Sequence, residues 1–122
     1  MTTSMRTLII PANIRLDQIA PLIGNTPLHP ISRVWSNPKV KIFAKLEWKQ
    51  LGGSEKSRPA FNIIRTALRQ GQFYGNRRLL DATSGNTGIA YASIGAALGI
   101  PVTLCLPENA SPERKQILKA LG

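Results

Sequence analysis

Apolar residues alternate with polar ones, or recur at helical spacing, from about residue 40 onwards, and this pattern predicts a folded α/β domain. In VKIFAKLE (40–47) apolar side chains take every second position, which is typical of a strand. The segment KQLGGS (49–54) ends that strand. Because one face of the next segment is apolar, we expect a helix that Ser57 caps, with Pro59 in its first turn and Gly71 as its stop.

Two further strand–helix pairs follow the first. A strand is predicted over 78–82 and a helix over 87–98, and the hexapeptide TSGNTG (83–88) joins them. The next strand, over 102–106, is apolar at all but one position, as expected when both of its faces are covered. A last helix is predicted over 112–121. The order βαβαβα predicts the fold class α/β, with a three-layer, mostly parallel sheet and right-handed crossovers.

The N-terminal residues show a weaker pattern. Residues 1–20 are expected to form an extended or loosely helical arm, and three prolines with a Gly-Asn pair predict a loop over 21–31. The expected organisation is therefore an N-terminal arm and loop (1–38) followed by an α/β domain (39–122).

Composition narrows the class of protein. A chain of 122 residues is long enough for one domain with a buried core, and 43% hydrophobic with 18% charged residues is typical of globular chains. With one cysteine (Cys105) and one histidine (His29), an internal disulfide framework and a cysteine-based zinc site are excluded. Only scattered acidic side chains remain as ligands, so no metal centre is expected.

The net charge of +10 raises the question of nucleic-acid binding. The basic residues are dispersed along the chain, with no run longer than Arg77-Arg78, and no nucleic-acid motif accompanies them. A solvated surface, or one whose acidic counterpart lies on another piece of protein, is the simpler interpretation. We therefore expect no nucleic-acid partner. A nucleic-acid module is kept only as the third hypothesis, after the two hypotheses given at the end of this subsection.

The stretch from residue 82 to residue 107 carries no charge, which raises the question of a membrane span. Its glycines, its serines and Pro101 predict a helix, a break and a strand rather than one long apolar helix. The N-terminal run Leu8-Ile9-Ile10 is too short for the apolar core of a signal peptide. We therefore expect a soluble, cytoplasmic protein without membrane contact.

The hexapeptide TSGNTG offers the chemistry of an anion site. It follows a predicted strand and begins a predicted helix, which is where ligands bind in open α/β sheets. A helix N-terminus presents unpaired N–H groups, Gly85 and Gly88 allow close approach, and the hydroxyls add donors. The alternative is an ordinary capped turn. Neither this hexapeptide nor GGSEKS (52–57) fits a dinucleotide-binding or Walker A pattern.

Five motifs in order and spacing carry a resemblance to a known family. They are IGNTPL (23–28), KLEW (45–48), GSEKSRPA (53–60), TSGNTGIA (83–90) and LPENASPERK (106–115). Together they resemble the N-terminal portion of the cysteine synthase and cystathionine β-synthase family. That family belongs to the tryptophan-synthase-β-like, fold-type II pyridoxal-phosphate enzymes.

The resemblance implies a cofactor, a reaction and a set of site residues. The cofactor is pyridoxal 5′-phosphate, Lys56 links to its aldehyde and acts as general base, and Asn86 contacts its phenolic oxygen. The implied reaction is a β-replacement that forms L-cysteine from O-acetylserine, or from O-phosphoserine or serine, and a sulfide donor. A homodimer is expected, as is typical of the family. The implied substrate-binding residues are those of the hexapeptide: Thr83, Ser84, Gly85, Asn86 and Thr87.

Two departures from the family pattern bear on activity. Glu55 stands where the family has an apolar residue and Ser57 where it has an aspartate, and a carboxylate beside Lys56 favours the charged amine. Family members are also longer, and their later phosphate-binding glycine loop has no counterpart among these residues. The isolated chain is therefore expected to be inactive. The alternative to an enzyme is a truncated, catalytically inactive paralogue that serves as a binding or interaction module.

Overall fold

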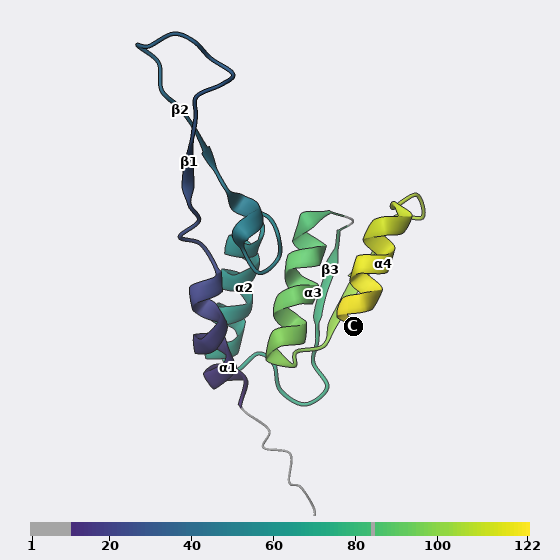
Figure 1. The fold of residues 1–122 in the computed structure, drawn as a ribbon. Helices are drawn as coiled ribbons and strands as arrows, with labels where there is room; N and C mark the ends of the chain where they lie inside the picture. The colour runs from purple at the N-terminus through teal and green to yellow at the C-terminus, as the bar shows by residue number, and fades with distance from the viewer. Residues whose placement is uncertain (1–10, 84) are drawn as a thin grey trace, which may run out of the picture.

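In this structure, a computed structural model, residues 11–83 and 85–122 are described, and they form an α/β fold with four α-helices and two sheets of two strands each (Figure 1). Residues 1–10, which are half of the predicted arm, and Ser84 of the hexapeptide lie outside the described residues. The elements in chain order are α1 (Ala12–Ile19), the 3₁₀ turn η1 (Ala20–Leu22), β1 (Leu28–Ile31), β2 (Ile42–Lys45), the 3₁₀ turn η2 (Glu47–Lys49), α2 (Ser57–Arg69), β3 (Leu79–Ala82), α3 (Asn86–Leu98), β4 (Val102–Cys105) and α4 (Pro112–Leu121).

The second half of the chain confirms the predicted strand–helix alternation. β3 pairs with β4 in parallel, with Leu79 opposite Val102, and α3 connects them. The residues that end α3 and begin α4 have the conformations typical of helix ends. Gly99 ends α3 in the left-handed conformation, and the Ser111 hydroxyl accepts a hydrogen bond from the backbone N–H of Arg114 at the start of α4.

Glycines let α3 lie close against β4. A methyl group at Gly95 would stand 2.5 Å from Cγ2 of Val102 and 2.9 Å from the carbonyl oxygen of Ile100. At Gly88 it would meet Cγ2 of Thr83 at 3.0 Å and Cδ1 of Leu104 at 3.2 Å. These approaches are shorter than side chains normally allow, so the two glycines set the distance between the helix and the sheet.

The predicted first strand has a different partner from the one expected. β2 pairs antiparallel with β1, whose residues were predicted to be loop, and Pro30 lies opposite Phe43. The prediction that this strand joins the parallel sheet was therefore wrong. Proline has no N–H to donate, yet it is tolerated in an edge strand, and β1 is one. Figure 1 shows the pair β1–β2 projecting away from the helices as a long hairpin.

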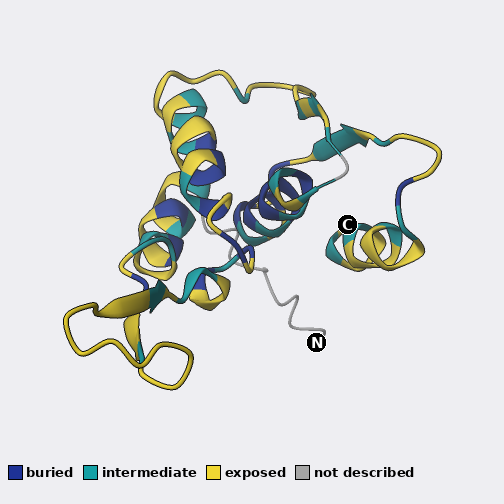
Figure 2. Ribbon diagram, turned by 90° about the horizontal axis from the view of Figure 1, so that it is seen from above, coloured by how far each residue is buried: buried dark blue, intermediate teal, exposed yellow. Residues whose placement is uncertain are grey.

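The described core lies among α1, α2 and α3. α1, in a segment predicted to be at most loosely helical, buries Leu16 and Ile19. Figure 2 shows the buried residues on the facing sides of these helices, whereas the hairpin and α4 are largely exposed. Ile63, an apolar residue of α2, is 50% exposed and lies outside this core. The buried core residues are Leu16, Ile19, Ala60, Phe61, Ile64, Ala90, Tyr91, Ile94, Leu98 and Ile100.

This packing places several chain ends together. α2 and α3 lie side by side with their N-termini at the same end of the molecule, which is also the end where β3 runs into the hexapeptide (Figure 1). The segments with predicted chemistry, 53–60 and 83–88, both lie at these N-termini. Within the described part of the chain, no helix combines the length and the hydrophobicity needed to cross a bilayer.

Candidate functional site

Lys56 stands immediately before the first residue of α2, with an accessible side chain. Its backbone N–H donates a hydrogen bond to Oγ of Ser54 at 3.3 Å. Its side chain is 46% exposed, and Nζ lies 3.2 Å from Oε1 of Glu55. The amine can therefore be reached by a small molecule, although a carboxylate lies within ion-pair distance of it.

Glu55 is ionised at neutral pH. The pKa of its carboxyl is lowered first by a hydrogen bond from its own backbone N–H and then by the Lys56 amine. Both side chains are about half exposed, so solvent screens the pair and its contribution to stability is small. The structure thus places the unusual residue Glu55 in direct contact with the predicted catalytic amine.

Ser57 does not cap the helix, contrary to the prediction. It is the first residue of α2 and is fully buried, and its Oγ accepts a hydrogen bond from the backbone N–H of Gly52 at 3.0 Å. A methyl group on Gly52 would stand 2.6 Å from that Oγ and 3.0 Å from Cα of Ala90. Ser57 therefore ties the loop before Lys56 to the start of α2, and Gly52 of that loop lies close against Ala90 of α3.

The hexapeptide connects β3 to α3 at this same end. The backbone N–H of Thr83 donates to the carbonyl of Cys105 at 3.2 Å, which continues the parallel ladder by one residue. The N–H of Gly85 donates to Oγ1 of Thr83 at 3.3 Å. Asn86 begins α3 and is exposed, and Thr87 is half-buried in its first turn. The predicted substrate residues that are described thus lie together at one helix start.

The N-terminus of α3 has the character of an anion site. Gly85 precedes the helix in an extended conformation, and no side chain among the described residues caps the first turn. A methyl group at Gly85 would have no neighbour within 4 Å among the described residues. A 13-residue helix presents a partial positive charge and N–H donors at this end. This geometry supports the predicted binding of a carboxylate.

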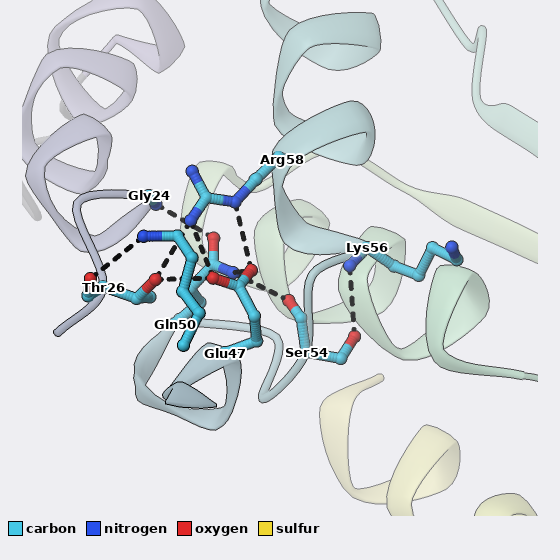
Figure 3. Close-up of polar contacts among 8 residues, drawn as sticks. Gly24, Thr26, Glu47, Gln50, Ser54, Lys56 and Arg58 are labelled. Atoms are coloured by element: carbon cyan, nitrogen blue, oxygen red, sulfur yellow. Dashed lines mark hydrogen bonds and ion pairs between the residues drawn. The ribbon is translucent and has the colours of Figure 1, made fainter. Parts of the chain in front are cut away.

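A polar cluster beside Lys56 was not predicted from the sequence. We call Thr26, Glu47, Gln50 and Arg58 the Glu47 cluster (Figure 3). The Glu47 carboxylate accepts from Nε and Nη2 of Arg58 at 3.1 and 2.8 Å. It also accepts from Oγ1 of Thr26 at 2.5 Å and from Nε2 of Gln50 at 2.6 Å. Four donors therefore converge on one carboxylate.

The Glu47 carboxylate is held in its charged form by these donors. The hydrogen bonds from Arg58 and then from Thr26 lower the pKa of Glu47 to about 2. The same pairing raises the pKa of the Arg58 guanidinium. Three of the resemblance motifs, at 23–28, 45–48 and 53–60, each contribute to this cluster. The presence of Thr26, Glu47 and Arg58 in three of the resemblance motifs was the one signal in the sequence that could have indicated this cluster.

Other features of the described chain do not add to the site. No group of three or more His, Cys, Asp or Glu side chains there is arranged to hold a metal. A groove of about 680 Å³ lies between α3, β4 and α4, and its lining is mainly apolar. Neither Lys56 nor any described residue of the hexapeptide lines that groove. We place the candidate site at the N-termini of α2 and α3, because the polar groups converge there.

Comparison with known proteins identifies the family of the chain. The sequence profile of the family described as "Pyridoxal-phosphate dependent enzyme" matches residues 19–122. The chain is 48% identical over 109 residues to a cysteine synthase of Aquifex aeolicus (strain VF5), covering 87% of this chain and 33% of that protein.

Two solved structures have the same fold. A hydrogen sulfide-producing enzyme from Fusobacterium nucleatum superposes with a TM-score of 0.78 at 36% identity, covering 88% of this chain and 34% of that one. A cysteine synthase from Entamoeba histolytica superposes with a TM-score of 0.77 at 34% identity, covering 100% of this chain and 36% of that one. The chain spans about a third of the length of each of these three proteins.

Proposed function

Since the chain belongs to the family of pyridoxal-phosphate dependent enzymes, we propose that it carries the cofactor lysine and the substrate-carboxylate loop of a cysteine synthase. The observation that carries this proposal is the convergence of Lys56 and the N-terminus of α3 at one end of the molecule. An accessible amine beside an anion site is what an aldehyde cofactor and an amino-acid substrate require. The 48% identity to a cysteine synthase supports the choice of reaction.

The residues present fit pyridoxal 5′-phosphate at this site. The half-exposed amine of Lys56 is the group that would hold the cofactor aldehyde, and the exposed amide of Asn86 would face its phenolic oxygen. Among the described residues, nothing lies within 4 Å of a methyl group built at Gly85, and this favours the approach of a bound molecule to the start of α3. When bound, the cofactor supplies an electron sink for the amino acid.

The hexapeptide would orient the substrate. Its carboxylate would accept hydrogen bonds from the first-turn N–H groups of α3 and from the hydroxyls of Thr83, Ser84 and Thr87, with Gly85 allowing close approach. Each such bond to a charged group contributes roughly 1.5–3 kcal/mol. Nζ of Lys56, once neutral, would accept the proton from the α-carbon of the substrate.

The reaction proposed is a β-replacement. Acetate leaves the β-carbon of O-acetylserine, or phosphate leaves that of O-phosphoserine, and sulfide adds there to give L-cysteine. The role of Lys56 is to move the α-proton, and that of the hexapeptide is to fix the carboxylate while this happens. A homodimeric state and a cytoplasmic location remain predictions beside this proposal.

A non-enzymatic role is the second candidate. The Glu55–Lys56 contact of 3.2 Å favours it, because a carboxylate in that place occupies the amine that the reaction needs. Under this alternative the chain keeps the fold of the family as a binding or interaction module. The two candidates differ in whether Lys56 reacts with the cofactor.

The test is the visible absorption of the protein loaded with pyridoxal phosphate. Lys56→Ala is expected to abolish the band of the protein-bound cofactor and to leave the far-ultraviolet circular dichroism unchanged, because the side chain is exposed and makes no core contact. Lys49→Ala, a lysine in the turn η2, is the matched control and should keep the band. A band that survives in Lys56→Ala would contradict the assignment.

A further inference from the structure

We propose that Glu47 and Arg58 are positioning residues for Lys56, which fix the backbone on both sides of the lysine and so set the direction of its amine. This inference deepens the proposed function and rests on it, because it gives Lys56 its cofactor role. Neither residue is assigned as a catalytic group, since the Glu47 cluster does not include the reacting amine.

The first route from the cluster to Lys56 runs through Arg58, two residues after the lysine. The guanidinium of Arg58 meets Glu47 in a two-bond fork, through Nε at 3.1 Å and Nη2 at 2.8 Å. A planar fork of this kind constrains the orientation as well as the distance of its partner. The first turn of α2, and with it the position from which Lys56 leaves the backbone, is therefore fixed relative to Glu47.

The second route runs through Gln50 and Ser54, before the lysine. Gln50 is 5% exposed, and its Nε2 donates both to Glu47 at 2.6 Å and to the backbone carbonyl of Ser54 at 3.2 Å. Oγ of Ser54 in turn accepts the backbone N–H of Lys56 at 3.3 Å. Figure 3 shows Lys56 at the right of the cluster, bonded through its backbone N–H to Ser54, with its side chain extending away from Glu47. The backbone is thus held to Glu47 from both sides of the lysine.

Glu47 is itself anchored by a third segment. Oγ1 of Thr26 donates to Glu47, and the carbonyl of Thr26 accepts from Nζ of Lys45 at 3.1 Å. The backbone N–H of Gly24 donates to Oε1 of Gln50 at 2.9 Å. The loop that follows η1 therefore holds both Glu47 and Gln50, and Oγ1 of Thr26 also accepts a hydrogen bond from Nη2 of Arg58 at 3.1 Å.

The ion pair between Arg58 and Glu47 is partly exposed, and this indicates that its main effect is on the position of Lys56 and not on the stability of the fold. The side chains of Arg58 and Glu47 are 39% and 22% exposed, so water screens the pair and its net contribution to folding is small. The two-bond fork and the hydrogen bonds of Gln50 fix the orientation of the backbone at Lys56. Orientation matters most for a reacting group, because a misplacement of about 1 Å can cost roughly 100-fold in rate. The effect on Lys56 should therefore exceed the effect on stability.

The test measures where pyridoxal phosphate attaches on the 122-residue chain. The cofactor is incubated with the protein, the adducts are reduced with borohydride, and labelling of each lysine is measured by peptide mapping. Glu47→Gln and Arg58→Lys are each expected to lower the preference for Lys56 over the other lysines by about tenfold. Hydrogen exchange of the amides of residues 54–60 should become faster in both variants.

Two controls separate the outcomes. Arg65→Lys makes the same change on the same helix, where the guanidinium contacts Asn62 and the ring of Phe61, and should keep the preference. Ile64→Val lowers stability from a fully buried position in α2 without touching the cluster, and should also keep it.

The labelling experiment distinguishes failure of the cofactor role of Lys56 from failure of the positioning role of Glu47 and Arg58. If the wild-type chain labels Lys56 no more than its other lysines, the cofactor role of Lys56 falls, and the positioning inference falls with it. If wild type prefers Lys56 and Glu47→Gln keeps that preference, the positioning inference alone is overturned. Loss of the preference in Ile64→Val to the same degree would also overturn it, because general destabilisation would then explain the effect.

Discussion

Glu55 is the residue that most sets this site apart from the family pattern. Its carboxylate lies 3.2 Å from the Lys56 amine, and its lowered pKa keeps it charged at neutral pH. Replacing Glu55 with valine, an apolar residue of the kind expected there, frees the amine from that partner. Because an exposed pair of this kind is weak, we expect reaction of Lys56 with pyridoxal phosphate to rise by no more than about fivefold.

The rate of adduct formation at Lys56, followed by absorbance and confirmed by peptide mapping, measures this effect. Glu108→Val makes the same substitution at an exposed position in the loop before α4 and should leave the rate unchanged. An unchanged rate in Glu55→Val would mean that the ion pair does not limit access to the amine.

Glu47 predicts a pH dependence of stability. Hydrogen bonds from Arg58 and Thr26 lower its pKa to about 2 in the folded chain, from an ordinary value of 4.5. Between these two pH values, Glu47 therefore stays charged in the folded state but takes up a proton in the unfolded state. The resulting stabilisation, which solvent screening keeps small, is fully present above pH 4.5 and is lost as the pH falls toward 2.

Urea unfolding of wild type and Glu47→Gln over this pH range tests the prediction. The wild type should lose its advantage over the variant progressively below pH 4.5. The carboxyls of Glu55 and Glu113 also have lowered pKa values, but both proteins carry them, so they cancel in the difference. A difference that stays constant down to pH 3 would contradict a charged, hydrogen-bonded Glu47.

At the scale of elements, the contact of α3 with β4 depends on Gly95. An added methyl group would stand 2.5 Å from Cγ2 of Val102 and 2.9 Å from the backbone carbonyl of Ile100. Because the backbone cannot give way easily, Gly95→Ala should push the helix from the sheet and cost roughly 1–3 kcal/mol of unfolding free energy. Gly85→Ala, where nothing among the described residues lies within 4 Å of the added methyl group, is the matched control and should lose much less stability than Gly95→Ala.

The antiparallel pair β1–β2 shows that a local pattern can predict a strand without predicting which strand pairs with it. The alternation in 40–47 correctly predicts a strand, but alternation reports which faces are covered and not which strand lies alongside. Proline at position 30 argued against a strand at 28–31, yet an edge strand tolerates it. Pairing with β1 was therefore decided by the tertiary arrangement.

At the scale of the whole molecule, the site is open to solvent. The side chain of Lys56 is 46% exposed and Asn86 is exposed. Catalysis depends on holding the reacting groups in place, and this can account for roughly 7–11 kcal/mol of a barrier. We therefore expect the 122-residue chain alone to form cysteine from O-acetylserine and sulfide no faster than free pyridoxal phosphate does.

Cysteine formation with and without the chain, at equal cofactor concentration, is the measurement. Lys56→Ala serves as the control for any contribution of the amine. A wild-type rate well above that of the free cofactor, and absent in Lys56→Ala, would show that these residues suffice for catalysis. Large apolar side chains on the hairpin, including Leu28 and Phe43 at 59% and 50% exposure, also favour association, so the assay should be repeated over a range of protein concentrations.

Local patterns of residues were sufficient to predict the elements from α2 onwards and to identify the residues with candidate chemistry. Helix and strand signals such as the Ser111 cap, the Gly99 stop and the apolar run of β4 act within a few residues, so they can be interpreted without knowing the fold. Lys56 and the hexapeptide were likewise identified from residue type and motif. Their assignment to cofactor and substrate remains a prediction.

The contacts that hold those residues in place depend on the folded arrangement of the whole chain. The members of the Glu47 cluster lie between positions 26 and 58, and each alone is an ordinary polar residue that could face solvent. Ser57 has the residue type of a helix cap, yet it is buried because Gly52 and Ala90 pack beside it. A hydrogen bond between distant segments depends on where the whole chain places both partners, and no local pattern of residues encodes that.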